Sequence, residues 1–379
     1  MRQIQMVNLK SQYLKIKDEI HLLFDEILTT SSFINGPHVN QFSNSLSDYL
    51  KVKHVIPCGN GTDALQLALM ACDLKPGDEV ITTPFTFVST VEVIAILGLK
   101  PIFVDICPNS FNIDTNKIEE KITPRTKAII PVHLFGRPAE MEAVMKLAKN
   151  YKLLVIEDAA QSLGADYTFS NGDQFKTGSI GDLGTTSFFP SKNLGCYGDG
   201  GAVFTNDGDL AEKVKSIANH GAEKKYIYKR VGINSRLDSL QAAVLLAKLP
   251  HLDAYNLSRQ RAAGIYDNLL KDISGIKCPS TSKKGVHIFH QYTLLIENKR
   301  DAVMQSLSKR GVPTAIYYPL PLHLQKAYAH YGYQKGVFPV AESFSNKVLS
   351  LPMHTELSVE DQKYIAESLI SSLQEVGEW

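Results

Sequence analysis

The chain has 379 residues, of which 44% are hydrophobic and 21% are charged. Such a length exceeds what one small domain needs, and the composition is typical of a globular protein with a sizeable core. Lys and Arg number 40 against 39 for Asp and Glu, so the near-zero net charge argues against a protein that binds nucleic acid over its whole surface.

The cysteines and the apolar runs bear on the cellular location. The five cysteines are Cys58, Cys72, Cys107, Cys196 and Cys278. Their number is odd and none forms a Cys-x-x-Cys motif, so we expect reduced thiols in a cytoplasmic protein and no zinc module. The N-terminus lacks the apolar segment of a signal peptide, and the longest apolar run, Val91–Leu99, is too short to cross a bilayer. We therefore expect no membrane partner.

Short apolar stretches alternate with helical patterns over the first 160 residues. The predicted helices are Ile16–Leu28, Gly59–Leu74, Phe87–Leu97 and Ala139–Lys149. The predicted strands are His54–Cys58, Glu79–Thr83, Pro101–Ile106, Lys127–His133 and Leu153–Asp158. This alternation predicts an α/β fold with a mostly parallel sheet flanked by helices. Ligands of such sheets bind at the carboxyl ends of the strands, where the first candidates for a site therefore lie.

The pattern changes near residue 250. Leu237–Leu270 is predicted to be helical with a kink at Pro250, and a strand over Val286–Ile296 and a helix over Asp301–Lys309 follow. The close pair His287 and His290 lies in that strand pattern, which favours a strand over a metal site. We therefore predict an N-terminal segment and large domain over residues 1–250 and a smaller α+β domain over residues 251–379.

A glycine-rich turn follows the first of the alternating strands. Gly59-Asn60-Gly61-Thr62-Asp63-Ala64 fits a loose GxGxxA pattern, which suggests dinucleotide binding. The acids about 20 residues on precede the next strand instead of following it, and no second turn of this kind exists, so that interpretation is weakened. The alternatives are a tight turn capped by Thr62 or Asp63, and an anion site at a helix N-terminus.

Two other features suggest chemistry. Val155–Ala165 places acids at the end of a buried strand, where a carboxylate needs a cationic partner or serves as a helix cap. Lys192 is the only cation of Ser187–Gly201, a stretch rich in aromatic residues and glycine. Burial there would lower the pKa of its amine and make the neutral form available.

Together these features match the needs of pyridoxal 5'-phosphate. Its phosphate needs a helix N-terminus such as Gly61-Thr62, and its ring needs an aromatic face such as Phe85. Its pyridine nitrogen needs an acid such as Asp158, and its aldehyde needs an amine such as that of Lys192 for a Schiff base.

The ordered motifs resemble those of a known family. They are GNGTDALQLAL, PFTFVSTVEVI, PRTKAIIPVHLFG, VIEDAAQSLGA, TSFFPSKNLGCYGDGGAVFTND and VGINSRLDSLQAA. They resemble the DegT/DnrJ/EryC1/StrS family of pyridoxal-phosphate-dependent nucleotide-sugar aminotransferases over nearly the whole chain. The resemblance implies the aspartate-aminotransferase fold, a homodimer with shared active sites, and transfer of an amino group from L-glutamate to a nucleotide-linked keto-sugar. Within the family it is closest to enzymes that aminate a 3-keto UDP-hexuronic acid for polysaccharide biosynthesis.

The resemblance also implies roles for individual residues. The catalytic pair would be Lys192 and Asp158. The cofactor contacts would be Gly61, Thr62, Phe85, Asp158, Gln161, Ser187, Lys192 and, from the neighbouring subunit, Asn234. The resemblance also gives Arg236, again from the partner, as a substrate contact. Further candidates for substrate contacts are Tyr317, Tyr318 and His323, because they lie in a loop-rich region that could close over the sugar. The aromatic residues and His323 could instead pack between the domains, and the roles of His220 and Arg230 stay open.

Four alternatives remain. The substrate could be a dTDP-linked 3- or 4-keto-6-deoxysugar, because Arg236 could equally meet a diphosphate. The chain could be a regulatory or sugar-binding protein on the same fold, although the lysine and the acid are both present. It could be a dehydratase, but such relatives replace the lysine by histidine. An NAD-dependent oxidoreductase is what the GxGxxA pattern alone suggests.

Overall fold

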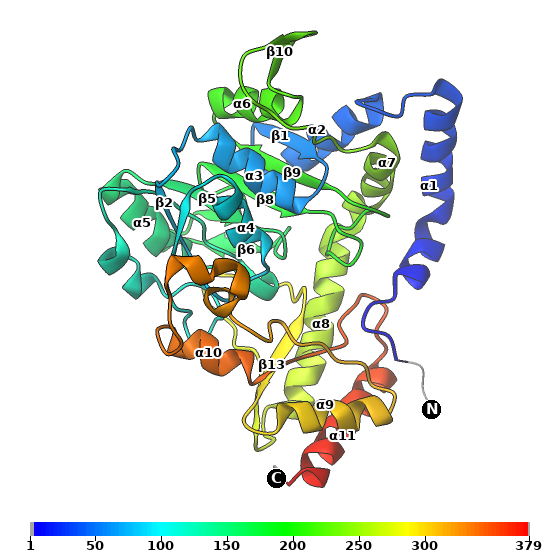
Figure 1. Cartoon of the computed structure of the whole chain (residues 1–379). Coiled ribbons are helices and arrows are strands. Elements are labelled where there is room, and N and C mark those ends of the chain that lie inside the picture. Colours follow the sequence, from blue (N-terminus) through cyan, green and yellow to red (C-terminus); the bar gives the residue numbers. More distant parts are fainter. Residues whose placement is uncertain (1–3, 378–379) are drawn as a thin grey trace.

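A seven-stranded sheet forms the centre of the computed structural model, which describes residues 4–377 (Figure 1). Its strand order is β1-β9-β8-β5-β4-β2-β3. The strands are β1 (His54–Cys58), β2 (Glu79–Thr82), β3 (Lys100–Phe103), β4 (Thr126–Ile129), β5 (Leu154–Asp158), β8 (Leu183–Ser187) and β9 (Gly201–Thr205). β9 runs antiparallel to both of its neighbours, β1 and β8, and every other pair of neighbours in this sheet is parallel, so the predicted, mostly parallel α/β sheet is confirmed.

Helices cover both faces of this sheet. Those around it are α2 (Pro37–Leu50), α3 (Gly61–Ala71), α4 (Ser89–Ile96), α5 (Met141–Tyr151), α6 (Gly208–Ala218) and α7 (Ser239–Lys248). Successive residues of β5 serve different cores: Ile156 packs with α3 and α6, and Val155 packs with α5. Because side chains of a strand alternate between faces, a continuous apolar strand of this kind must be buried on both sides.

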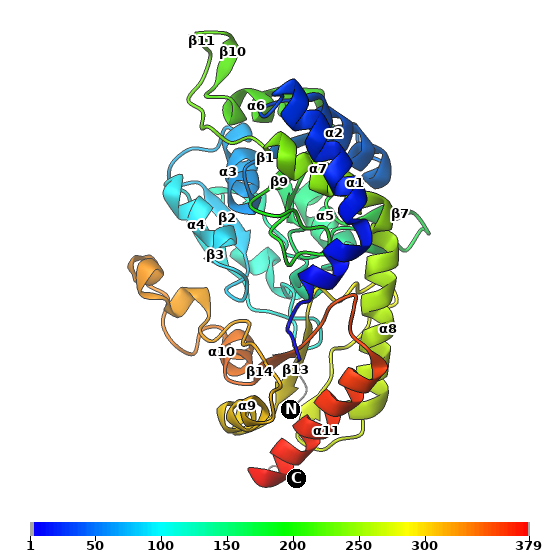
Figure 2. The ribbon, with the colours of Figure 1, turned by 90° about the vertical axis from the view of Figure 1, so that its right-hand side faces the viewer.

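A second core forms around a smaller antiparallel sheet. Its elements are β12 (Ile276–Lys277), β13 (Tyr292–Ile296), β14 (Val348–Leu351), α8 (Leu252–Leu270), α9 (Arg300–Lys309) and α11 (Val359–Glu375). The predicted kink at Pro250 lies in a 3-10 turn, Leu249–His251, between α7 and α8. From there α8 extends away from the central sheet toward α9 and α11 (Figures 1 and 2). Leu252 of α8 belongs to a core of the large sheet and Tyr266 to the second core, so the domain boundary near residue 250 stays a prediction.

The remaining elements lie at the periphery. They are α1 (Leu9–Thr30), α10 (Pro339–Ser345), the strand pair β6 (Asp166–Thr168) and β7 (Gln174–Lys176), and the hairpin β10 (Ala222–Lys224) and β11 (Ile227–Tyr228). The hairpin projects beyond α6 in both views (Figures 1 and 2). Within residues 4–377 no helix is both long and apolar enough to cross a membrane.

The strand predicted over Val286–Ile296 begins only at Tyr292. Before it, the backbone finds partners outside a strand ladder. The amide of Phe289 donates to Nδ1 of His287, and the carbonyls of Phe289 and His290 accept from the buried Arg259. Phe289 also has a left-handed φ of 48°. The alternating pattern therefore marks a buried loop that carries both histidines.

Candidate active site

The carboxyl ends of β5 and β8 lie side by side, because the two strands are parallel neighbours. Asp158 ends β5 and Ser187 ends β8. The Asp158 carboxylate is nearly buried, and its Oδ2 accepts a hydrogen bond of 2.8 Å from Oγ1 of Thr90. Its Oδ1 accepts one of 3.2 Å from the amide of Ala160. Asp158 is thus held in place at the sheet edge where ligands of α/β proteins bind.

The glycine-rich turn after β1 packs directly on the end of β8. A side chain on Gly61 would place its Cβ 2.6 Å from Cβ of Ser187, so only glycine fits there. Asn60 caps α3 by accepting from the amide of Asp63. The amides of Gly61 and Thr62 lie in the first turn, where a helix offers them no partner. The structure therefore brings Gly61, Thr62 and Ser187 together around a helix N-terminus.

Lys192 follows β8 in a loop closed by the hydrogen bond from its amide to the carbonyl of Phe189. Burial of the amine lowers its pKa to about 8, although the nearby charge of Asp158 acts in the opposite direction. Some of the side chain still reaches solvent. Among residues 4–377 no hydrogen bond or ion pair engages the amine. An amine that is poorly solvated, close to an acid and without a partner is suited to covalent chemistry.

Gln161 connects this site to the C-terminal part of the chain. Its Oε1 accepts from the amide of Phe135 at 2.7 Å, and its Nε2 donates to the hydroxyl of Tyr318 at 3.3 Å. Burial raises the pKa of Tyr318, and the nearby Asp158 raises it further. The structure therefore brings Tyr318 close to Asp158, and its contact with a substrate stays a prediction. Tyr317 is partly exposed beside it, and its hydroxyl interacts with Gln291.

The structure does not support the predicted role of Phe85. Its side chain is 0% exposed and packs between Phe111 and Tyr318, so no ring face is free for a ligand. Phe87 is 55% exposed and its ring lies 6.4 Å from that of Tyr318. The sequence signal for Phe87 is the repeated aromatic of Phe85-Thr86-Phe87, in which the pattern alone does not distinguish the two rings. Phe87 is the aromatic side chain that is free to cover a ring.

His323 is also placed differently from the prediction. It is 1% exposed, packs against the ring of Phe338, and its Nε2 lies 3.1 Å from Oε1 of Glu342. A side chain buried in this way serves packing between the two parts of the chain and does not present a surface to a sugar. These contacts favour the alternative of packing between the two parts of the chain for His323.

The segment that carries Asn234 and Arg236 lies against the glycine-rich turn. Between them, Ser235 accepts from the amide of Gly59 at 2.9 Å and donates to Oδ2 of Asp63 at 2.6 Å. Asn234 itself is exposed and Arg236 is partly exposed. The segment is thus anchored to its own chain through Ser235, while Asn234 remains available to another molecule.

His220 and Arg230 flank the base of the hairpin β10–β11. The amide of His220 donates to the carbonyl of Ile233, and the amide of Arg230 donates to the carbonyl of Gly221 at 3.4 Å. A Cβ built on Gly221 would lie 1.8 Å from the carbonyl oxygen of Arg230, so this position requires glycine. His220 is exposed and Arg230 is partly exposed. Within the part of the chain that the structure describes, the contacts of these two side chains assign neither a role, so both stay open.

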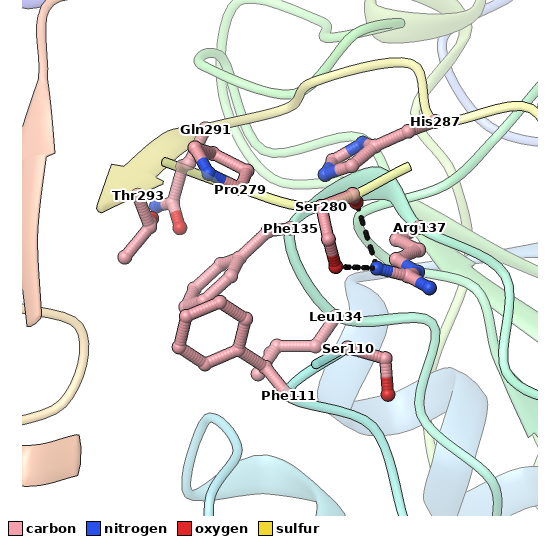
Figure 3. Close-up of a pocket in the computed structure, with 10 residues that line it drawn as sticks. All are labelled: Ser110, Phe111, Leu134, Phe135, Arg137, Pro279, Ser280, His287, Gln291 and Thr293. Atoms are coloured by element: carbon pink, nitrogen blue, oxygen red, sulfur yellow. Dashed lines mark hydrogen bonds between the residues drawn. The ribbon is translucent and has the colours of Figure 1, made fainter. Parts of the chain in front are cut away.

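A separate small pocket lies beyond Phe135 (Figure 3). Phe111, Leu134 and Phe135 form one side, and His287, Ser280 and Arg137 form another. Nη1 of Arg137 donates to the carbonyl and hydroxyl of Ser280, both at 2.7 Å. With about 10 Å³ of space, the pocket holds no more than a single water and is not the site of a cofactor. No group of His, Cys, Asp and Glu side chains suited to a metal ion occurs among the described residues.

A family model described as the DegT/DnrJ/EryC1/StrS aminotransferase family matches residues 14–370. The chain belongs to this family. A protein of Geobacillus stearothermophilus named pleiotropic regulatory protein is 47% identical over 368 residues, which are 97% of each chain. UDP-2-acetamido-2-deoxy-3-oxo-D-glucuronate aminotransferase of Pseudomonas aeruginosa is 45% identical and covers 97% of this chain and 99% of its own.

Solved structures agree with this membership. An aminotransferase of this family from Brucella abortus matches with a TM-score of 0.90 and 41% identity, over 97% of this chain and 99% of its own. NtdA from Bacillus subtilis, solved with the bound cofactor PMP, matches with a TM-score of 0.87 and 35% identity, over 95% of this chain and 82% of its own. The family member described here therefore has the fold of the pyridoxal-phosphate sugar aminotransferases, and it is itself a pyridoxal-phosphate-dependent aminotransferase.

The residues of this family member fit the cofactor. Among the described residues the amine of Lys192 has no hydrogen-bond partner, the first-turn amides of Gly61 and Thr62 suit a phosphate, and Asp158 offers a carboxylate. Phe87 supplies the exposed ring that Phe85 lacks. The donor set thus matches an aldehyde, a phosphate and a protonated heterocycle in one place.

Proposed function

We propose that this aminotransferase moves an amino group from L-glutamate to the C3 keto group of a UDP-linked sugar, with UDP-3-keto-N-acetylglucosaminuronate as the preferred acceptor. The observation that carries the reaction class is the free amine of Lys192 close to Asp158, with a pKa lowered to about 8. A lysine of this pKa has a usable neutral fraction near neutral pH, as a nucleophile and general base requires.

The chain's own groups divide the work. Bound in this site, the cofactor carries the amino group from donor to acceptor and acts as an electron sink. Lys192 would hold the cofactor covalently, and its Nζ, when freed, would act as general base and acid for proton transfer. Asp158 pairs with the ring nitrogen. Gly61, Thr62 and Ser187 would hold the phosphate, and Phe87 would supply an aromatic face for the ring.

The choice of acceptor rests on similar proteins and on Arg236. The relative from Pseudomonas aeruginosa bears the name of a 3-oxo-glucuronate aminotransferase. A protein of Acidithiobacillus ferrooxidans, 45% identical over 96% of both chains, is named UDP-N-acetyl-3-dehydro-alpha-D-glucosamine 3-aminotransferase. A planar guanidinium such as that of Arg236 can bind a sugar carboxylate through two hydrogen bonds. This combination favours a UDP-linked 3-keto-uronate over a dTDP-linked deoxysugar.

The dimer is part of the proposal. Asn234 is exposed and Arg236 is partly exposed, while Ser235 between them binds the turn of its own chain. We assign Asn234 and Arg236 to the neighbouring subunit's site, where they contact the phosphate and the sugar. Two identical chains related by a two-fold axis would then share both sites.

Absorption spectroscopy and product analysis test the reaction. The purified protein with pyridoxal phosphate should absorb in the near-visible, and its spectrum should change on addition of glutamate. A panel of UDP- and dTDP-ketosugars then identifies the acceptor by the mass of the aminated product. A protein that stays colourless after incubation with the cofactor contradicts the proposal, and amination of only dTDP-sugars contradicts the choice of acceptor.

Subunit mixing tests the shared sites. Lys192→Ala and Arg236→Ala should each be inactive. If the two residues serve one site from different chains, random re-association of the two variants produces dimers with one intact site, and about a quarter of the wild-type activity should return. Recovery of no activity, when wild-type dimers re-associate under the same conditions, would place Arg236 in its own chain's site.

A further inference from the structure

A ladder of side-chain hydroxyls runs along the start of α4. Oγ of Ser89 lies 2.7 Å from Oγ1 of Thr62, and Oγ1 of the next residue, Thr90, donates to Oδ2 of Asp158 at 2.8 Å. Oγ1 of Thr86 lies 3.1 Å from Oγ1 of Thr90. Thr86, Ser89 and Thr90 are 2%, 7% and 0% exposed. Two consecutive residues of one helix thus reach the phosphate side and the nitrogen side of the same site.

The direction of the hydrogen bonds follows from the count of protons. A hydroxyl carries one proton, and Thr90 gives its proton to Asp158, which as a carboxylate only accepts. Thr90 must therefore accept from Thr86, and Thr86 is the donor of that pair. The order Thr86 to Thr90 to Asp158 is a one-way chain of donors. These hydrogen bonds fix the orientation of the carboxylate from the side of α4 and leave its other side for a ligand.

The same reasoning applies to the pair Ser89 and Thr62 on the phosphate side of the site. Either hydroxyl of the pair Ser89 and Thr62 can be the donor in the structure itself. When Thr62 gives its proton to an anion, its oxygen is left as an acceptor and Ser89 must donate to it. Ser89 thus supports Thr62 in the orientation that an anion requires.

We propose that Thr90, backed by Thr86, and Ser89 are positioning residues that fix Asp158 and Thr62 relative to each other through the rigid first turn of α4. The proposal rests on the proposed roles of Asp158 and Thr62 toward the cofactor. Thr90 acts on the ring nitrogen through Asp158, and Ser89 acts on the phosphate through Thr62. Neither residue contacts the reacting atoms.

Cofactor analogues separate the effect of Thr90, exerted through Asp158, from the effect of Ser89, exerted through Thr62. Thr90→Val keeps the branched shape and removes the hydroxyl, and Thr90→Ser keeps the hydroxyl. We expect Thr90→Val to raise the dissociation constant of pyridoxal phosphate about tenfold, a typical effect of losing a hydrogen bond to a charged group. An analogue with CH in place of the ring nitrogen should bind Thr90→Val and the wild type equally, because it makes no bond to Asp158. Thr90→Ser should behave as the wild type with both.

Ser89→Ala should show the opposite selectivity. It should weaken binding of pyridoxal phosphate but not of pyridoxal, which lacks the phosphate. If Thr90→Val does not fold, Thr86→Val decides the question, with the same selectivity for the ring nitrogen and a smaller effect. The proposal is overturned if a variant loses affinity for pyridoxal phosphate and for its matching analogue equally. It is also overturned if the variants lose affinity for neither compound. A wild-type protein that binds no pyridoxal phosphate overturns the proposed function instead, so the two failures are distinguishable.

Discussion

His133 and Glu157 are both fully buried and face each other at 2.9 Å, on the opposite side of β5 from Asp158. Nδ1 of His133 accepts from the amide of Ala139, so its Nε2 carries the proton that Glu157 accepts. Glu157 also accepts from the amides of residues 178, 180 and 181. Two adjacent acids of one strand thus have separate tasks, one in the structure and one in the site.

This separation predicts different effects of two substitutions. Glu157→Leu should lower the free energy of unfolding by about 3 kcal/mol or more, because several buried donors lose their acceptor. Asp158→Asn should leave stability nearly unchanged and weaken cofactor binding and turnover. Urea unfolding of the cofactor-free proteins and a cofactor titration measure both quantities. A large loss of stability in Asp158→Asn would contradict the assignment.

The covalent link should involve one lysine. Burial lowers the pKa of Lys192 and of Lys248 alike to about 8, but the amine of Lys248 donates to the carbonyl of Gly195 and lies over the ring of Tyr197. After borohydride reduction of the protein with its cofactor, peptide mass spectrometry should find the added mass on Lys192 alone. Lys192→Ala should lose the adduct and turnover, whereas label on Lys248 would contradict the assignment.

The two phenylalanines of Phe85-Thr86-Phe87 should differ in the same way. Phe87→Ala changes an exposed ring and should weaken cofactor binding at nearly constant stability. Phe85→Ala removes a fully buried ring and should cost about 3–5 kcal/mol of stability. Thermal unfolding without cofactor and a cofactor titration separate the effects. If Phe87→Ala binds cofactor as the wild type does, its ring does not cover the cofactor.

The sequence predicted the sheet class because buried parallel strands are continuous in apolar residues, and it predicted Lys192, Asp158 and the turn at Gly61 because their motifs are local. It could not distinguish Phe85 from Phe87, since both are aromatic and only their packing differs. The strand predicted over Val286–Ile296 begins only at Tyr292, because alternation does not reveal that Arg259 donates to the carbonyls of Phe289 and His290. Hydroxyl contacts such as Thr90 to Asp158 join distant segments and have no local pattern.

Gly61 offers a test of the phosphate turn. Gly61→Ala would place a Cβ 2.6 Å from Cβ of Ser187 and should displace the turn from β8, weakening cofactor binding at least tenfold. Gly264, within α8, has no atom within 4 Å of a Cβ built on it. Gly264→Ala is therefore the matched control and should stabilise the protein by about 0.5–1 kcal/mol without changing affinity. Equal affinities for both variants would contradict the close packing.

The buried His287 should make the stability of the protein sensitive to acid. Burial and the nearby Arg137 lower its pKa from 6.5 to about 3, so between these values the unfolded chain binds a proton that the folded chain does not. Its contribution to stability is complete above pH 6.5 and falls with pH at up to about 1.4 kcal/mol per unit. In His287→Asn, the free energy of unfolding measured with urea should decrease less between pH 6.5 and 4.5 than in the wild type. Substitution of the exposed His330 by Asn should leave this decrease unchanged. If the free energy of unfolding of His287→Asn and of the wild type had the same slope against pH, the lowered pKa of His287 would be contradicted.

The helix α8 has a consequence for how the protein unfolds. Its first turn contributes Leu252 to the core of the large sheet, and further along it Tyr266 lies in the second core. Loss of either core would remove packing that stabilises this helix, and the helix would then stabilise the other core less. The two parts of the chain should therefore unfold cooperatively, and heating should melt them in a single transition.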